Sequence, residues 1–178
     1  RDSLSAAYFP VVTTLRSYAF TGCRGLTSAS FPALTAIGGS AFNACSSLTT
    51  LSFPAAITIE ANAFQECISL EMAYFPSVEY ISALAFRSCY NLATASFPAA
   101  DFIMSSAFYN CSKFLSLYLL GSSVVSLNHV NVFSSTPISN NTTYTDGVHG
   151  SIFVPASLYD TYISRANWSA YSSRFVSV

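Results

Sequence analysis

The chain has 178 residues, of which 52% are hydrophobic and only 8% are charged, with a formal net charge of −1. This apolar content suits a sizeable core and excludes a disordered chain, which combines low hydrophobicity with high charge. The seven basic residues are scattered from Arg1 to Arg174, without the clusters that bind nucleic acid. No stretch reaches the ~20 apolar residues of a membrane-spanning helix, so we expect no membrane insertion.

The sequence repeats every 22 residues from its first residues onward. The aromatic and cysteine columns are Phe-Pro at Phe9, Phe31, Phe53, Phe75 and Phe97, Ala-Phe at Phe20, Phe42, Phe64, Phe86 and Phe108, and Cys23, Cys45, Cys67, Cys89 and Cys111. The aliphatic columns are Leu15, Ile37, Ile59, Ile81 and Ile103, then Leu26, Leu48, Leu70, Leu92 and Phe114. Five columns in one register predict a solenoid, because each repeat buries its apolar side only by stacking on its neighbours.

Within one repeat, two segments have different patterns. The segment from Leu26 to Phe31 alternates inward and outward positions and predicts a short strand, which Pro32 ends because it lacks an N–H donor. The segment from Ile37 to Cys45 has small residues and favours a tight helical or 3₁₀ turn. We therefore expect one strand per coil, paired in parallel with the strands of the neighbouring coils.

The repeat unit resembles that of the BspA-like bacterial leucine-rich-repeat proteins. Their pattern runs Leu-x-x-Leu-x-Phe/Ile-Pro, then Ile, Ala-Phe and Cys-x-x-Leu, and it fits this chain from Leu4 to about Leu120. The resemblance implies an α/β solenoid, a right-handed leucine-rich-repeat fold with short parallel strands, short helical turns and a C-terminal cap. The sequence departs from the pattern at the second strand position, which is often alanine here: Ala7, Ala29, Ala73 and Ala95.

We divide the chain into two parts. Residues 1–120 hold five 22-residue units, the first incomplete, and residues 121–178 hold a degenerate last repeat, a loop and a capping strand and helix. Because the chain begins without Met and within a repeat, we expect it to be part of a longer protein.

The C-terminal part predicts a cap over the last coil, as the open end of a solenoid requires. Residues 134–150 are rich in Ser, Asn, Thr and Gly and predict a long surface loop, followed by the last strand at residues 151–155. Ser157 and Asp160 have the spacing of a capping box that opens a helix to about Ala166. The residues expected to face the core from this cap are Leu158, Tyr162, Ile163, Trp168, Tyr171 and Phe175.

The five cysteines have no zinc-ligand spacing, so we interpret them as buried free thiols that pack as small apolar groups. His129 and His149 both lie in the irregular tail, and Asp146 lies in a Gly-rich loop near His149. A catalytic base needs a rigid frame, so we predict no active site there, no cofactor and no enzyme. The acidic residues occupy varied repeat offsets and form no calcium ladder: Glu60, Glu66, Glu71, Glu79 and Asp101.

The outward strand positions are the best candidates for ligand contact. They line one concave face that is small, polar and uncharged, and solenoids use such extended surfaces for recognition. Three tyrosines share one strand offset, although exposed tyrosine also occurs on strands for its propensity alone. The candidate ligand-binding residues are Tyr8, Ser30, Ser52, Met72, Tyr74, Ser96 and Tyr118.

Three functions stay open. The family resemblance implies an extracellular or cell-surface module of the adhesion type that binds a protein or a glycan without catalysis. The run Val-Pro-x-Ser-Leu…Asn-Trp-Ser-x-Tyr, from Val154 to Tyr171, resembles the tail that closes repeat proteins of gut Firmicutes and their phages, which suggests a phage virion tail or fibre instead. A third hypothesis is an accessory domain of an enzyme.

Overall fold

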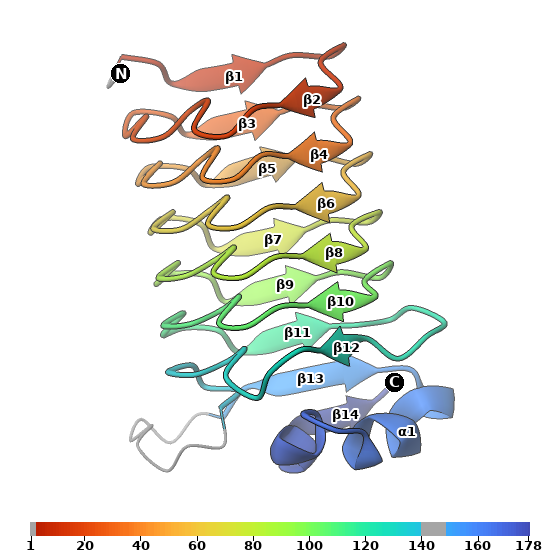
Figure 1. Cartoon of the computed structure of the whole chain (residues 1–178). Helices are drawn as coiled ribbons and strands as arrows, with labels where there is room; N and C mark the ends of the chain where they lie inside the picture. The colour runs from red at the N-terminus through yellow and green to blue at the C-terminus, as the bar shows by residue number, and fades with distance from the viewer. Residues whose placement is uncertain (1–2, 140–148) are drawn as a thin grey trace.

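The computed structural model describes residues 3–139 and 149–178. Figure 1 shows a stack of coils with the N-terminus at one end and a small helical cap at the other. Each of the regular coils contributes one longer strand and one two-residue strand, which lie on different sides of the stack (Figure 1). The connecting turns form the remaining side.

The longer strands form the side that we call the first sheet. Its strands are β1 (Ala6–Tyr8), β3 (Ser28–Ser30), β5 (Thr50–Ser52), β7 (Met72–Tyr74), β9 (Thr94–Ser96), β11 (Ser116–Tyr118), β13 (Ser151–Val154) and β14 (Phe175–Ser177). Their pairing is parallel and in step with the repeat, so Ala7 lies opposite Ala29 and Ala95 opposite Leu117. The expected parallel solenoid is thereby confirmed.

A second sheet was not expected, because the sequence predicted one strand per coil. It contains β2 (Thr14–Leu15), β4 (Ala36–Ile37), β6 (Thr58–Ile59), β8 (Tyr80–Ile81), β10 (Phe102–Ile103) and β12 (Ser126–Leu127). Each of these strands buries its Leu or Ile and turns its other residue outward. Two residues are too few to show alternation in a sequence, and only stacking on the next coil supplies their hydrogen bonds.

The segment between Ile37 and Cys45 forms turns and no helix in the described coils. Ser40 and Ala44 have positive φ angles of 53° and 57°, which aim alternate N–H groups along the stack. The Phe42 N–H thus donates to Ala63 O at 2.8 Å, and the Ala44 N–H donates to Gln65 O at 2.8 Å. A helix would use these donors internally, whereas the turns leave them for the neighbouring coil.

The core is built from the columns seen in the sequence. From Phe31 to Phe108 the rings of both phenylalanine columns are at most 1% exposed. Rings within a column stack, as between Phe42 and Phe64 at 5.4 Å and 2°, and rings of the two columns meet edge to face, as between Phe42 and Phe53 at 5.6 Å and 62°. Both arrangements are favourable for aromatic quadrupoles.

The cap has a different start and end from those predicted. Its helices are the 3₁₀ helix η1 (Ala156–Leu158), α1 (Tyr159–Ser164) and the 3₁₀ helix η2 (Ser169–Arg174). The capping-box prediction was wrong: Pro155 precedes η1, so Ser157 lies inside that turn and makes no cap bond to α1. The last strand is also not β13, because Phe175 pairs in parallel with Ile152 and thereby adds β14.

The predicted inner face of the cap is confirmed. Tyr162, Trp168, Tyr171 and Phe175 are buried, and Leu158 and Ile163 pack against the core.

Side chains of the cap take over the hydrogen bonds that a further coil would make. The Trp168 indole N–H donates to Val125 O at 2.6 Å, and the Val125 N–H donates to the Tyr162 hydroxyl at 3.1 Å. The Asn167 amide donates to Leu127 O at 2.8 Å. The polar backbone of the last coil is therefore satisfied under an apolar plug.

The predicted surface loop at residues 134–150 lies only partly at the surface. Thr136 is fully buried and its hydroxyl donates to Phe133 O at 2.7 Å, while Ile138 is fully buried in the core. Ile138 also contacts Gly150 so closely that a Cβ there would lie 2.7 Å from its side chain. Residues 140–148, which include Asp146, lie outside the described residues.

Candidate functional site: the outer face of the first sheet

The structure brings all seven candidate residues onto one face. They belong to β1, β3, β5, β7, β9 and β11, and their side chains point away from the core. Tyr8, Met72 and Tyr74 are the most exposed, at 66%, 62% and 58%. We call this surface the tyrosine face; its members are Tyr8, Ser30, Ser52, Met72, Tyr74, Ser96 and Tyr118.

The strand register defines how the tyrosines are spaced. Tyr8 lies opposite Ser30, which lies opposite Ser52, and Tyr74 lies opposite Ser96, which lies opposite Tyr118. Serine thus separates the aromatic side chains along the column. None of the residues in the strands of the first sheet is charged, so the face offers apolar rings and hydroxyl groups rather than an electric field.

Phe153 extends this column and was missed in the sequence. It lies opposite Tyr118 in β13, and the two rings stack at 4.5 Å with an angle of 9° between their planes. The signal was present, because Phe153 precedes Val154-Pro155 as Tyr8 precedes Phe9-Pro10. The long insertion before β13 breaks the 22-residue count and hides that correspondence.

The ladder of the first sheet is interrupted at one place, between β5 and β7. In the coils on either side, the Phe31 N–H donates to Ser52 O at 2.9 Å and the Phe75 N–H donates to Ser96 O at 3.1 Å. The equivalent groups at the interruption are the Phe53 N–H and the Tyr74 carbonyl, and neither makes a hydrogen bond within residues 3–139 and 149–178. The second sheet stays paired at the same level, where Ile59 lies opposite Ile81.

A hollow of about 150 Å³ lies at this interruption. Its walls combine apolar rings with exposed backbone and contain no charged side chain. The residues that line it are Leu51, Ser52, Phe53, Pro54, Tyr74 and Pro76.

A larger hollow of about 420 Å³ lies beside the second sheet. Arg16, Gly38 and Glu60 are among the residues that line it. A Cβ on Gly38 would lie 2.3 Å from Leu15 O, so glycine is needed for coil packing here. Glu60 accepts a hydrogen bond from the Gly39 N–H at 2.7 Å. The packing of the coils therefore accounts for the glycine at position 38.

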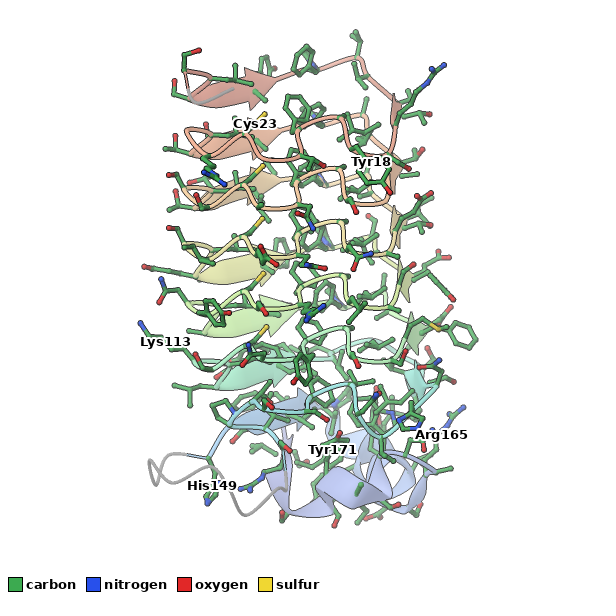
Figure 2. All side chains as sticks on the ribbon, turned by 60° about the vertical axis from the view of Figure 1, so that its left-hand side comes forward. Tyr18, Cys23, Lys113, His149, Arg165 and Tyr171 are labelled. Carbon is green, nitrogen blue, oxygen red and sulfur yellow. The ribbon has the colours of Figure 1, made fainter. Side chains whose placement is uncertain are left out.

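The five cysteines are free and buried, as predicted. Figure 2 shows their sulfur atoms following one another down the stack from Cys23. The thiols of Cys45, Cys67 and Cys89 each donate to a phenylalanine carbonyl of the preceding coil at 3.1 Å. Burial, with the neighbouring Cys23 adding to it, raises the pKa of Cys45 to about 12, and burial raises the pKa of Cys67 and Cys89.

These thiols are expected to be inert in the folded protein. The thiolate is the reactive form; burial shields all five thiols, and the raised pKa values of Cys45, Cys67 and Cys89 further suppress it there. A thiol reagent at about pH 8 should label almost none of them under native conditions and all five after denaturation without reductant. Labelling of fewer than four cysteines in the denatured chain would contradict the free-thiol assignment.

The two histidines considered for catalysis both lie at the surface. His149 is exposed and lies at the edge of the C-terminal end in Figure 2, and His129 is also exposed. Asp146 lies outside the described residues. Within residues 3–139 and 149–178, no three His, Cys, Asp or Glu side chains are grouped so as to hold a metal ion. The acidic residues predicted to be solvated are all exposed: Glu60, Glu66, Glu71, Glu79 and Asp101.

Parallel coils that bury columns of Leu, Ile and Phe and expose a strand face define a leucine-rich-repeat solenoid. The chain belongs to the BspA-type leucine-rich-repeat family: the BspA type Leucine rich repeat region matches residues 2–115 in six copies. The predicted resemblance to this family is confirmed, with six copies of the repeat where five units were expected. Such repeat families are typically non-catalytic. None of the curated proteins matches the chain.

Solved structures with the same fold are bacterial leucine-rich-repeat proteins. One is a leucine rich cell surface protein from Faecalibacterium prausnitzii, with a TM-score of 0.69 and 24% identity over 85% of this chain and 39% of that chain. Another is the Treponema pallidum leucine rich repeat protein, with a TM-score of 0.53 and 25% identity over 70% of this chain and 73% of that one. The pneumococcal vaccine antigen PcpA has a TM-score of 0.66 and 15% identity over 96% and 42% of the two chains.

The chain therefore spans 39% of the length of the Faecalibacterium protein. No helix among the described residues is both long and apolar enough to cross a membrane.

Proposed function

We propose that the chain is a non-catalytic binding module of the adhesion type that acts at the cell surface or outside the cell. The observation that carries this proposal is the tyrosine face, an uncharged surface that extends over six strands. Its most exposed side chains are Tyr8, Met72 and Tyr74. Tyrosine suits recognition because its ring packs against apolar groups and its hydroxyl donates and accepts hydrogen bonds.

A protein is the proposed ligand class, with a glycan as the alternative. Leucine-rich repeats generally mediate protein binding, and one protein of similar fold is described as a cell surface protein. A role in a phage virion rests on the resemblance of the C-terminal run alone, so we favour the surface role. Because the strands of the face carry no charge, binding should depend only weakly on salt.

The double substitution Tyr74→Ser and Tyr118→Ser tests the tyrosine face. Panels of purified host extracellular proteins and of glycans are screened first, and the affinity of any ligand found is then measured with both proteins. We expect the double variant to bind at least ~tenfold more weakly, because aromatic side chains dominate the affinity of interfaces. Its melting temperature should fall only slightly, because Tyr74 is exposed and Tyr118 loses only its stacking contact with Phe153.

Tyr18→Ser is the matched control. Tyr18 is 68% exposed but lies in the turns rather than in the first sheet, as Figure 2 shows. The Tyr18→Ser variant should therefore bind the ligand with the same affinity as the unmodified chain. Equal affinities of the double variant and the unmodified chain would show that the ligand binds outside the tyrosine face.

A further inference from the structure

The interruption between β5 and β7 has a cause in the core. The inward position at the middle of each strand forms a column of small residues, Ala7, Ala29, Ala73 and Ala95, in which Leu51 stands between Ala29 and Ala73. The alanines are buried, whereas Leu51 is half-buried. A larger side chain in a space shaped for alanine forces its surroundings apart.

Leu117 shows what happens when a leucine in this column has room. It is fully buried, and its strand β11 stays paired with both β9 and β13. The coil that contains Leu117 is longer, because Ile103 to Leu127 spans 24 residues where Ile81 to Ile103 spans 22. The coil of Leu51 has no such extra residues, so the ladder opens instead.

The opening leaves hydrogen-bonding groups of both kinds beside the hollow. The Phe53 N–H is a donor and the Tyr74 carbonyl is an acceptor, and they belong to two residues that line the hollow. The Glu71 N–H and the Thr49 carbonyl, at the other end of the interruption, are also unbonded among the described residues, but they do not line the hollow. Backbone groups left without a protein partner favour a ligand or water that satisfies them.

We propose that this hollow binds a carboxamide group, the end of an Asn or Gln side chain that a protein partner inserts. This proposal rests on the proposed function and names the contact at its centre. A carboxamide is neutral, as the uncharged lining requires, and it carries one acceptor and two donors. Its oxygen accepts from the Phe53 N–H while its NH₂ group donates to the Tyr74 carbonyl.

The rest of the lining suits the methylene groups of such a side chain. Leu51, Pro54, Pro76 and the ring of Tyr74 supply apolar surface around the two polar backbone groups. A carboxylate would meet the Tyr74 carbonyl without a proton to donate, and an ammonium group would leave the Phe53 N–H unsatisfied. A hydroxyl group carries its donor and its acceptor on one oxygen atom, whereas the carboxamide of Asn or Gln carries them on two atoms, so that each atom can meet one of the two backbone groups.

Propionamide, which reproduces the end of a glutamine side chain, is the probe for this site. It is titrated into the ¹⁵N-labelled chain while the amide resonances are followed. We expect a saturable shift at the Phe53 amide, with weak, roughly millimolar affinity. Propionate has no donor for the Tyr74 carbonyl, and propanol carries its donor and its acceptor on a single oxygen atom, so both should shift this resonance at least ~fivefold less at equal concentration. Absence of a saturable shift at the Phe53 amide, or an equal shift with propanol, would overturn the proposal.

Leu51→Ala and Leu117→Ala form a matched pair of variants. Leu51→Ala restores the alanine column, so the ladder should close, the Phe53 amide should become protected from hydrogen exchange and propionamide affinity should fall at least ~tenfold. Leu117→Ala makes the same change in a closed ladder and should leave propionamide binding unaltered. Retained binding by Leu51→Ala with a protected Phe53 amide would refute the site.

Ser52→Val tests the site if the Phe53 amide of the Leu51→Ala variant remains unprotected from hydrogen exchange. Ser52 is exposed at the rim of the hollow, so valine should narrow the hollow without disturbing the core. Its propionamide affinity should fall at least ~tenfold, and an unchanged affinity would refute the site.

N-acetylglucosamine is titrated in parallel because its acetamido group is also an amide. Tighter binding of this sugar than of propionamide at the Phe53 amide would replace the protein partner by a glycan and overturn the proposal. The broader function is judged separately: loss of ligand affinity in the Tyr74→Ser and Tyr118→Ser variant supports the tyrosine face even if propionamide does not bind.

Discussion

Phe64→Ala is expected to lower the free energy of unfolding by ~3–5 kcal/mol, the usual cost of removing a buried aromatic ring. Phe64 is fully buried, and its ring stacks on Phe42 at 5.4 Å and on Phe86 at 5.3 Å. Phe53 and Phe75 contact the same ring from the other column, at 6.0 Å and 5.7 Å. Because coils of equal length hold these rings in register, the surroundings cannot collapse into the cavity without breaking the stack.

Phe102→Ala is the control for this experiment. Phe102 is 48% exposed on the outer side of β10, so its loss should cost less than ~1 kcal/mol. Both variants are compared by urea unfolding followed by circular dichroism, with the slope of each transition checked because repeat proteins can unfold in parts. A loss below ~1 kcal/mol for Phe64→Ala would mean that this column does not hold the coils together.

Trp168→Ala should destabilise the protein by a similar ~3–5 kcal/mol through a different mechanism. Trp168 is fully buried in the cap and contacts Phe133, Tyr162 and Phe175 with ring centroids 5.5–6.0 Å apart. Its indole N–H also donates to Val125 O in the last coil. The substitution therefore leaves both a cavity and a buried carbonyl that has lost its donor.

Trp168→Phe separates the two contributions. It keeps most of the ring but removes the N–H, so we expect a loss of ~1–3 kcal/mol, the cost of an unsatisfied buried group. Ser169→Ala changes the next residue, which is exposed, and should have almost no effect. Thermal and urea unfolding measure all three. Equal stability of Trp168→Ala and the unmodified chain would show that the cap does not protect the end of the stack.

The Phe64 and Trp168 variants test the two ways in which the apolar and polar groups of a coil are covered in a solenoid. Inside the stack, each coil is covered by another coil with the same columns. At the C-terminal end, side chains replace that coil: an indole, a hydroxyl and an amide meet the backbone groups of Val125 and Leu127. The end of the solenoid is thus closed by specific side chains of the cap, together with the strand β14 that pairs with β13.

The regular coils were predictable because every coil meets the same neighbours. A position such as Phe64 has Phe42 on one side and Phe86 on the other. The sequence of one repeat therefore describes the environment of the equivalent position in every regular coil. The outward position of Tyr8, Tyr74 and Tyr118 followed from the same register. The cap residues Trp168 and Tyr171 were recognisable by their size and spacing alone, since large aromatic rings near the end of a solenoid need a place to be buried.

Features that depend on contacts between coils could not be predicted. The second sheet and the turns around Ser40 and Ala44 exist because N–H and carbonyl groups pair with the next coil, which two or three residues of sequence do not reveal. Phe153 and β14 joined the first sheet across insertions that broke the repeat count.

The interruption beside Tyr74 shows most clearly the difference between features visible in the repeat pattern and features that depend on contacts between coils. The repeat pattern alone shows that Leu51 stands in a column of alanines. Whether that leucine fits depends on the space between neighbouring coils, which is set by the length and packing of the whole stack. The contacts between coils show that Leu117 is accommodated and that the strands part at Leu51, because close-packed interiors respond to added volume by local displacement.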